Sequence, residues 1–176
     1  MPNYWIPPGL VAALCLIHLL GQVFPRTYRR MALQPRHRDI WQIATFHWVH
    51  GSLAHLFFNC LALLILSTLI VLQDAAQFWW LSLVVLMVAG WGTWLFSSAE
   101  RVAGASALVF GYWGFIVAAA AISGKPQWTA TAAISLLFYS GLWATLGKVV
   151  KGTSWSAHFW GLCGGILAAL FLFSRI

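Results

Sequence analysis

The chain has 176 residues, of which 61% are hydrophobic and 7% are charged, and its formal net charge is +7. This composition excludes an ordinary soluble domain, because such domains carry about 25% charged residues. Half of the ten basic residues lie in one connector between apolar segments, so we expect anionic lipid headgroups to be their partner, and no nucleic acid.

Six apolar windows are each long enough to cross a bilayer, and such segments are expected to be helical because lipid offers no partner for backbone N–H and C=O groups. They predict an all-α integral membrane protein with a single transmembrane domain over residues 1–176. No cleavable signal peptide is expected, since residues 1–8 lack a basic segment. The windows are residues 5–24, 53–72, 78–97, 102–122, 128–147 and 155–174.

The connector between the first two windows, residues 25–52, is unusually long, and long loops in compact proteins are usually functional or disordered. Its second half reads DIWQIATFHWVH, which is apolar and aromatic enough to lie in the membrane interface, so we expect this loop to be partly embedded. The later connectors, around residues 73–77, 98–101, 124–127 and 147–154, are predicted to be ordinary turns. His18 and His37 have no evident partners and are interpreted as structural.

Polar side chains near the starts of the second, fourth and sixth windows carry the most information, because burying them in hydrocarbon is costly. His55 and Asn59 are four residues apart and share one helix face. Ser106 follows the start of its window by about four residues and His158 by about three. Successive spans alternate in direction, so all four side chains are expected in one leaflet, roughly 5–6 Å below one face.

A serine and a histidine at one depth suggest nucleophilic catalysis, because a serine hydroxyl needs a base at neutral pH. The three acidic residues, Asp39, Asp74 and Glu100, all fall in connectors, so we expect a Ser-His dyad without a buried acid. His55, Asn59 and the backbone N–H of Ser106 are suitable donors to an oxyanion.

Three motifs resemble those of rhomboid intramembrane serine proteases of the minimal six-span bacterial type. They are HGSLAHLFFN at the second span, GASA at the fourth and AHFWGLCGG at the sixth. The resemblance implies a rhomboid-like bundle that cleaves transmembrane segments of other membrane proteins without a metal or organic cofactor. It implies Ser106 as the nucleophile, His158 as the base and His55, Asn59 and Ser106 as the oxyanion hole. The implied supporting residues are His50, Gly104, Phe110, Gly161 and Gly165.

This sequence departs from the family motifs at three positions. Ala107 replaces the second glycine of the nucleophile motif, and the Trp–Arg pair of the first loop is here Trp41–Gln42. Phe110 occupies the aromatic position expected to stack on the base, where it keeps the packing but lacks a phenolic hydroxyl. Whether Ala107 lowers activity depends on the backbone conformation at that position.

Three other functions fit parts of the pattern. An inactive rhomboid-like protein would bind transmembrane clients without cleaving them. A metal site would use His47, His50, His55 and His158, although the lack of nearby thiolates and carboxylates disfavours a closed tetrahedral site. A transporter is disfavoured because the polar groups cluster in one leaflet.

Two arguments about membrane orientation conflict. The resemblance implies a multi-pass protein of the cell (inner) membrane with its site facing the extracytoplasmic side. The positive-inside rule predicts a cytoplasmic site, because the loops beside Ser106 carry eight basic residues and the opposite loops carry two. The eight are Arg26, Arg29, Arg30, Arg36, Arg38, Arg101, Lys148 and Lys151, and the two are Lys125 and Arg175.

Overall fold

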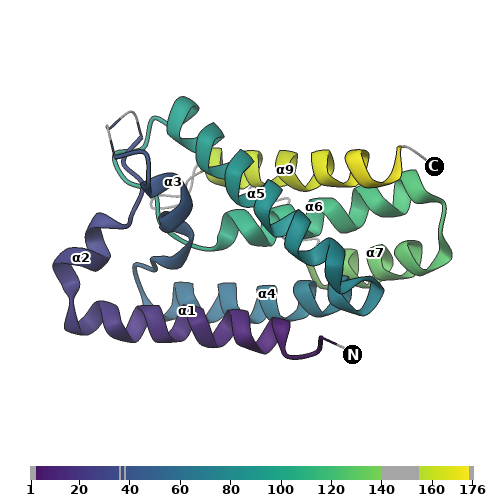
Figure 1. The fold of residues 1–176 in the computed structure, drawn as a ribbon, viewed down its shortest axis with the longest axis horizontal. Helices are drawn as coiled ribbons and strands as arrows, with labels where there is room; N and C mark the ends of the chain where they lie inside the picture. Colours follow the sequence, from purple (N-terminus) through teal and green to yellow (C-terminus); the bar gives the residue numbers. More distant parts are fainter. Residues whose placement is uncertain (1–2, 36, 38, 140–154, 175–176) are drawn as a thin grey trace.

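The computed structural model describes residues 3–35, 37, 39–139 and 155–174 (Figure 1). All regular elements of this part of the chain are helical. They are α1 (Ile6–Val23), α2 (Pro25–Arg30), α3 (Gln42–Thr45), the 3-10 turn η1 (Phe46–Trp48), α4 (Leu53–Gln73), α5 (Ala75–Phe96), α6 (Ser106–Ser123), α7 (Pro126–Tyr139) and α9 (Trp155–Phe173).

Five of these helices, α1, α4, α5, α6 and α9, are long and apolar enough to cross a membrane. They correspond to the first four predicted windows and the sixth. The fifth window, residues 128–147, is represented by α7, which is described to Tyr139 and has 14 residues. Residues 140–147 lie outside the described part of the chain, so the count of six spans stays a prediction.

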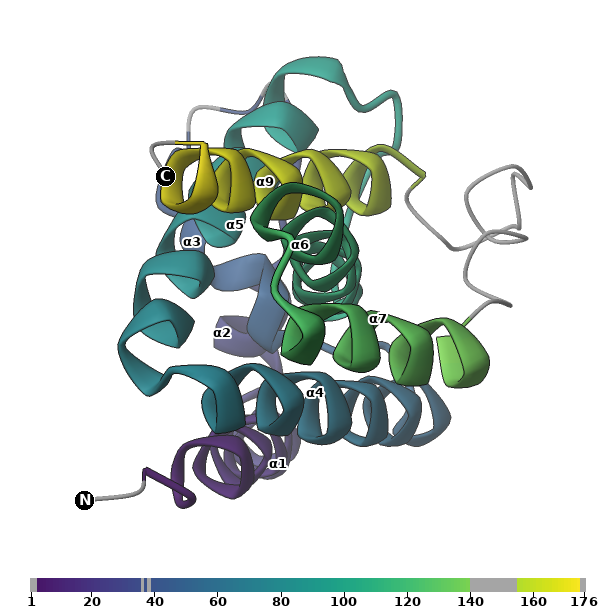
Figure 2. The ribbon, with the colours of Figure 1, turned by 90° about the vertical axis from the view of Figure 1, so that its right-hand side faces the viewer.

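Helix α6 lies in the middle of the bundle, among α4, α5, α7 and α9 (Figure 2). Of the residues in its apolar window, 61% are buried, against 28% in α1. Its most extensive contact is with α9, and glycines make this contact close. A Cβ atom on Gly161 would overlap the backbone carbonyl of Ala107, and one on Gly165 would overlap that of Gly111. Small residues therefore bring α6 and α9 together, as they do in many membrane helix pairs.

The junction between α4 and α5 is shorter than the turn predicted around residues 73–77. Asp74 alone separates the two helices, and its carboxylate accepts a 2.8 Å hydrogen bond from the backbone N–H of Ala76. This cap satisfies one of the free N–H groups at the start of α5. A side-chain cap thus replaces the expected loop.

The start of α6 also differs from the prediction. The helix begins at Ser106 and not at residue 102, so Ser106 is its first residue. The preceding segment is extended because its backbone bonds to the first connector. Val102 and Leu33 exchange two 2.8 Å hydrogen bonds, and the N–H of Gly104 donates to the carbonyl of Phe46 at 3.0 Å.

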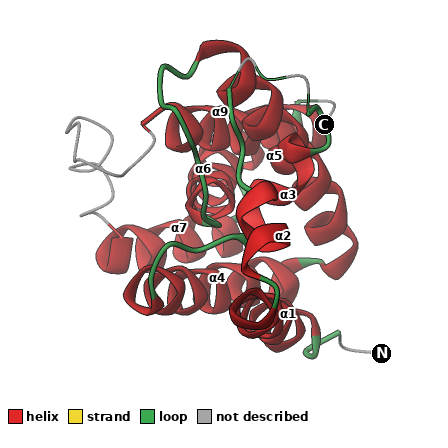
Figure 3. Cartoon of the chain, turned by 90° about the vertical axis from the view of Figure 1, so that its left-hand side faces the viewer, coloured by secondary structure: helices red, strands yellow, loops and turns green. Residues whose placement is uncertain are grey.

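The segment that docks on the first connector therefore follows directly after the predicted turn at residues 98–101. Figure 3 shows the loops gathered at the end of the bundle where α2 and α3 lie. The helices α4, α6 and α9 all begin at this end (Figure 1). The starts of three helices and the long first connector therefore surround one region.

Candidate active site

Ser106 and His158 meet between the first turns of α6 and α9. The Ser106 Oγ atom lies 2.9 Å from His158 Nε2, which is hydrogen-bond distance. Ser106 is half-buried and His158 is buried. The ring of Phe110, one turn after Ser106, stacks on the His158 imidazole with 4.4 Å between centroids and 22° between planes. This packing holds the imidazole in one orientation beside the hydroxyl.

No carboxylate orients this histidine within the described residues. The His158 Nδ1 atom is buried and makes no hydrogen bond there. Asp74 caps α5 at the opposite end of the bundle, while Asp39 and Glu100 are exposed. Among the described residues the arrangement is therefore a serine–histidine pair without an acidic third member.

His55 and Asn59, both on α4, lie against Gly104, two residues before Ser106. A Cβ atom added to Gly104 would be 2.8 Å from His55 Nε2 and 3.7 Å from Asn59 Nδ2. Gly104 also has a φ angle of +124°, which residues with a Cβ rarely adopt. Glycine at this position therefore allows two side-chain nitrogens to approach the backbone that leads into Ser106.

The donors around Gly104 and Ser106 include groups without acceptors. Asn59 Nδ2 is buried and makes no hydrogen bond to any described residue. Because Ser106 is the first residue of α6, its N–H has no acceptor within the helix. Buried donors that lack an acceptor are costly in a folded protein and are a usual feature of sites that stabilise a negative oxygen.

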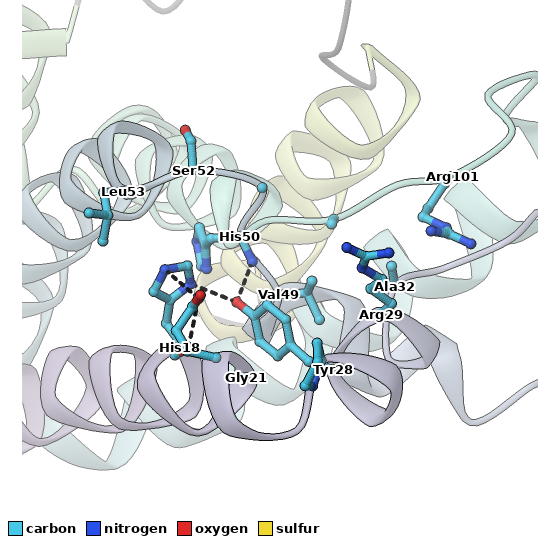
Figure 4. A pocket seen from close by; sticks show the side chains of 14 residues that line it. His18, Gly21, Tyr28, Arg29, Ala32, Val49, His50, Ser52, Leu53 and Arg101 are labelled. Atoms are coloured by element: carbon cyan, nitrogen blue, oxygen red, sulfur yellow. Dashed lines mark hydrogen bonds between the residues drawn. The ribbon is translucent and has the colours of Figure 1, made fainter.

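His50 links this region to the first connector. Its Nε2 atom accepts a 3.3 Å hydrogen bond from the N–H of Ala105, and its own N–H donates to the Tyr28 hydroxyl at 2.8 Å (Figure 4). The same hydroxyl lies 2.9 Å from His18 Nδ1. Burial and, to a smaller extent, the neighbouring His55 lower the pKa of His50 to about 4. His50 is therefore neutral at pH 7, as its role as an acceptor requires.

Ala107 and Gln42, two departures from the motifs, both fit their surroundings. Ala107 is the second residue of α6, so its backbone is helical and its methyl group brings no strain; it packs in a buried cluster with Phe46 and Ala157. The buried Gln42 amide accepts a 2.9 Å hydrogen bond from the Gln34 N–H and donates one of 2.9 Å to the Arg30 carbonyl. Gln42 thus joins two parts of the first connector.

Sequence reasoning missed Tyr28 and assigned no role to Gln42, and it found no partner for His18. Tyr28 contacts groups 10 and 22 residues away along the chain, and no local pattern announces such contacts. The metal hypothesis finds no support in the described residues, where no three His, Cys, Asp or Glu side chains are arranged to hold an ion. His47 instead packs on the ring of Phe46, with 3.8 Å between centroids.

Comparison with known proteins shows the family of this chain. The family model of the Rhomboid domain matches residues 37–175. An uncharacterized protein of Mycobacterium tuberculosis is 28% identical over 184 residues, which cover 96% of this chain and 76% of that protein. An uncharacterized protein of Mycobacterium leprae is 27% identical over 173 residues, which cover 92% of this chain and 68% of that protein.

Proposed function

Because this chain belongs to the rhomboid family, we propose that it is an intramembrane serine endopeptidase that cleaves transmembrane segments of other membrane proteins. The observation that carries the proposal is the 2.9 Å distance between Ser106 Oγ and His158 Nε2. A neutral imidazole at this distance can accept the hydroxyl proton as the oxygen attacks a carbonyl carbon.

In the proposed acylation step, Ser106 Oγ bonds to the carbonyl carbon of the scissile peptide while its proton passes to His158 Nε2. The carbonyl oxygen becomes an oxyanion, which the Ser106 N–H, Asn59 Nδ2 and His55 would stabilise. The intermediate then collapses, the C–N bond breaks, and His158 returns the proton to the leaving amine.

In the proposed deacylation step, water replaces the amine. His158 Nε2 takes a proton from the water as its oxygen attacks the ester carbon, and the Ser106–carbonyl bond then breaks. The proton returns to Ser106 Oγ, and the new carboxyl end leaves. The stacked Phe110 ring supports the imidazole in both steps, since it limits rotation of the base.

The whole chain is proposed to act as one transmembrane domain of the cell (inner) membrane, with its site on the extracytoplasmic side. The proposed orientation follows the family and opposes the charge bias, because part of the basic first connector is ordered. Leu33 bonds to Val102 in the segment before α6, and Gln42 joins two parts of the connector. The partners would be the bilayer and a membrane-spanning substrate.

The experiment combines a fluorophosphonate probe with a cleavage assay on single-span test proteins in proteoliposomes. The wild-type chain should be labelled at Ser106 and should cleave at least one test protein. Ser106→Ala and His158→Ala should each abolish both signals. Ser123→Ala, at the far end of the same helix, is the matched control and should retain both.

Two outcomes would contradict the proposal. Cleavage by the Ser106→Ala variant would show that the hydroxyl is not the nucleophile. A folded wild-type chain that captures test proteins, but is neither labelled nor able to cut any of them, would instead support the inactive client-binding protein.

A further inference from the structure

A cavity of about 520 Å³ lies beside His50, between the end of α1, the helix α2 and the residues that precede α4 (Figure 4). It is separate from the Ser106–His158 contact, because neither residue lines it. Its volume is in the range of small-molecule sites. The catalytic proposal gives this cavity no role.

Two arginines give the cavity its charge. Arg29 reaches it from α2 and Arg101 from the segment before α6, and Figure 4 shows both on the side opposite Ser52 and Leu53. No acidic residue lines the cavity, and neither guanidinium has an ion pair with any described residue. Two guanidinium groups without a counter-charge are suited to bind a phosphate, whose oxygens accept paired N–H bonds.

Among the other polar groups that line the cavity, the Tyr28 hydroxyl is already ordered. Tyr28 is held between His18 and the backbone of His50 by hydrogen bonds of 2.9 and 2.8 Å. This wall is therefore rigid before any ligand binds, which reduces the entropy lost on binding.

A second, apolar groove of about 390 Å³ adjoins the charged cavity and shares Gly21 and Tyr28 with it. Its other lining residues include Ile17, Leu20, Phe24 and Met31. Leu20 and Phe24 are 47% and 61% exposed, so this groove opens to the lipid side of α1. A charged cavity that continues into an apolar groove has the shape of an amphiphile.

The position of the charged cavity and the apolar groove also fits an amphiphile. They lie where α1 ends at Val23 and α4 begins at Leu53, and both helices are membrane-span candidates. The ends of spanning helices lie at the level of the lipid headgroups. The phosphate of a lipid in this leaflet is therefore at the depth of Arg29 and Arg101.

We propose that Arg29 and Arg101 bind the phosphate of an anionic phospholipid while the groove between α1 and α2 holds one of its acyl chains. A zwitterionic lipid fits less well, since no acidic side chain lines the cavity to pair with a choline group. The binding does not depend on catalysis. It would stabilise the Tyr28–His50 contact and, through it, the segment that leads into Ser106.

The test measures the thermal unfolding of the purified full chain in uncharged detergent at 150 mM salt. The probes are dioctanoyl phosphatidylglycerol, dioctanoyl phosphatidylcholine, dioctanoylglycerol and inorganic phosphate. Phosphatidylglycerol should raise Tm in a saturable way, by roughly 3–6 °C at ten times Kd. The other three probes should each give less than about half of this shift.

Single variants separate the site from general charge attraction. Arg29→Gln and Arg101→Gln should each weaken phosphatidylglycerol binding about tenfold, the loss expected for one charged hydrogen-bonded pair. Arg26→Gln is the matched control: it removes the same charge from α2, but Arg26 does not line the cavity. This variant should bind like the wild type.

Each remaining outcome overturns the proposal. Equal loss in Arg26→Gln and Arg29→Gln would show diffuse attraction to a basic segment. A full shift with inorganic phosphate would show an ion site without a lipid, and a full shift with dioctanoylglycerol would show an apolar groove only. An equal response to phosphatidylcholine would show that the anionic charge is not recognised.

Discussion

The His50 imidazole accepts a hydrogen bond from the backbone N–H of Ala105, the residue before Ser106, across a distance of 3.3 Å. Fifty-five positions separate these two residues in the sequence. The bond joins the first connector to the start of α6, together with those from Gly104 to Phe46 and between Leu33 and Val102. The position of the candidate nucleophile therefore depends on a loop that precedes α4.

The titration of His50 should make stability depend on pH. Burial lowers the pKa of His50 to about 4 in the folded protein, whereas the unfolded chain has the ordinary value near 6.5. The unfolded state therefore binds more protons between these values. Stability should be complete above about pH 6.5 and fall as the pH drops towards 4, by an amount on the order of 3 kcal/mol.

Thermal unfolding of the wild type and of His50→Gln in detergent between pH 7 and 4.5 checks this prediction. Glutamine can accept the Ala105 N–H bond but does not titrate, so the variant should lose less stability over this range. An identical pH dependence in both proteins would show that other groups, such as the buried His47, cause it.

Replacement of Asn59 should reduce activity without a matching loss of stability. Asn59 Nδ2 makes no hydrogen bond to a described residue, so its removal breaks no bond of the folded protein. If the amide stabilises the oxyanion, Asn59→Ala and the similarly shaped Asn59→Leu should lower kcat by roughly 10–1000-fold. Cleavage rates and unfolding curves on the same samples test this. A variant that is equally active, or inactive only because it is unfolded, would contradict the assigned role.

Gly104→Ala should abolish cleavage, because the new methyl group would lie 2.6 Å from His55 Cε1 at a backbone φ angle of +124°. The backbone strain alone is of order 1–3 kcal/mol. The matched control is Gly124→Ala at the other end of α6, where φ is +62° and nothing lies within 4 Å of the new atom. That variant should lose about 1 kcal/mol of stability and keep its activity. Similar activities for the two variants would rule out a role for Gly104 in the site.

Gln42→Leu should loosen the first connector. It removes the acceptor of the Gln34 N–H and the donor to the Arg30 carbonyl, so we expect a loss of roughly 1–3 kcal/mol. Activity should fall with it, because the neighbouring Leu33 pairs with the segment before Ser106. Gln73→Leu is the control, since it loses one bond to Thr131 at the opposite end of the bundle. The activity of this control should not change. Unfolding curves and cleavage assays of both variants check the prediction, and an equal loss of activity in both would contradict it.

The sequence alone predicted the five long apolar helices that are candidates to span the membrane. The bounds of α4 and α9 differ from the predicted windows by one residue at most, because helical hydrogen bonds are local and an apolar segment in lipid has no other way to pair its backbone. The motifs also placed Asn59, Ser106 and His158 close to the starts of three helices. These features depend on neighbours within one or two helical turns.

Only the tertiary structure decided how those helix starts meet. The beginning of α6 at Ser106 depends on Leu33 and Phe46, and the ordered hydroxyl of Tyr28 depends on His18 and His50. Each bond joins segments far apart in the chain, so no local propensity could specify it. The charged cavity arises in the same way, because its walls come from three separate parts of the chain.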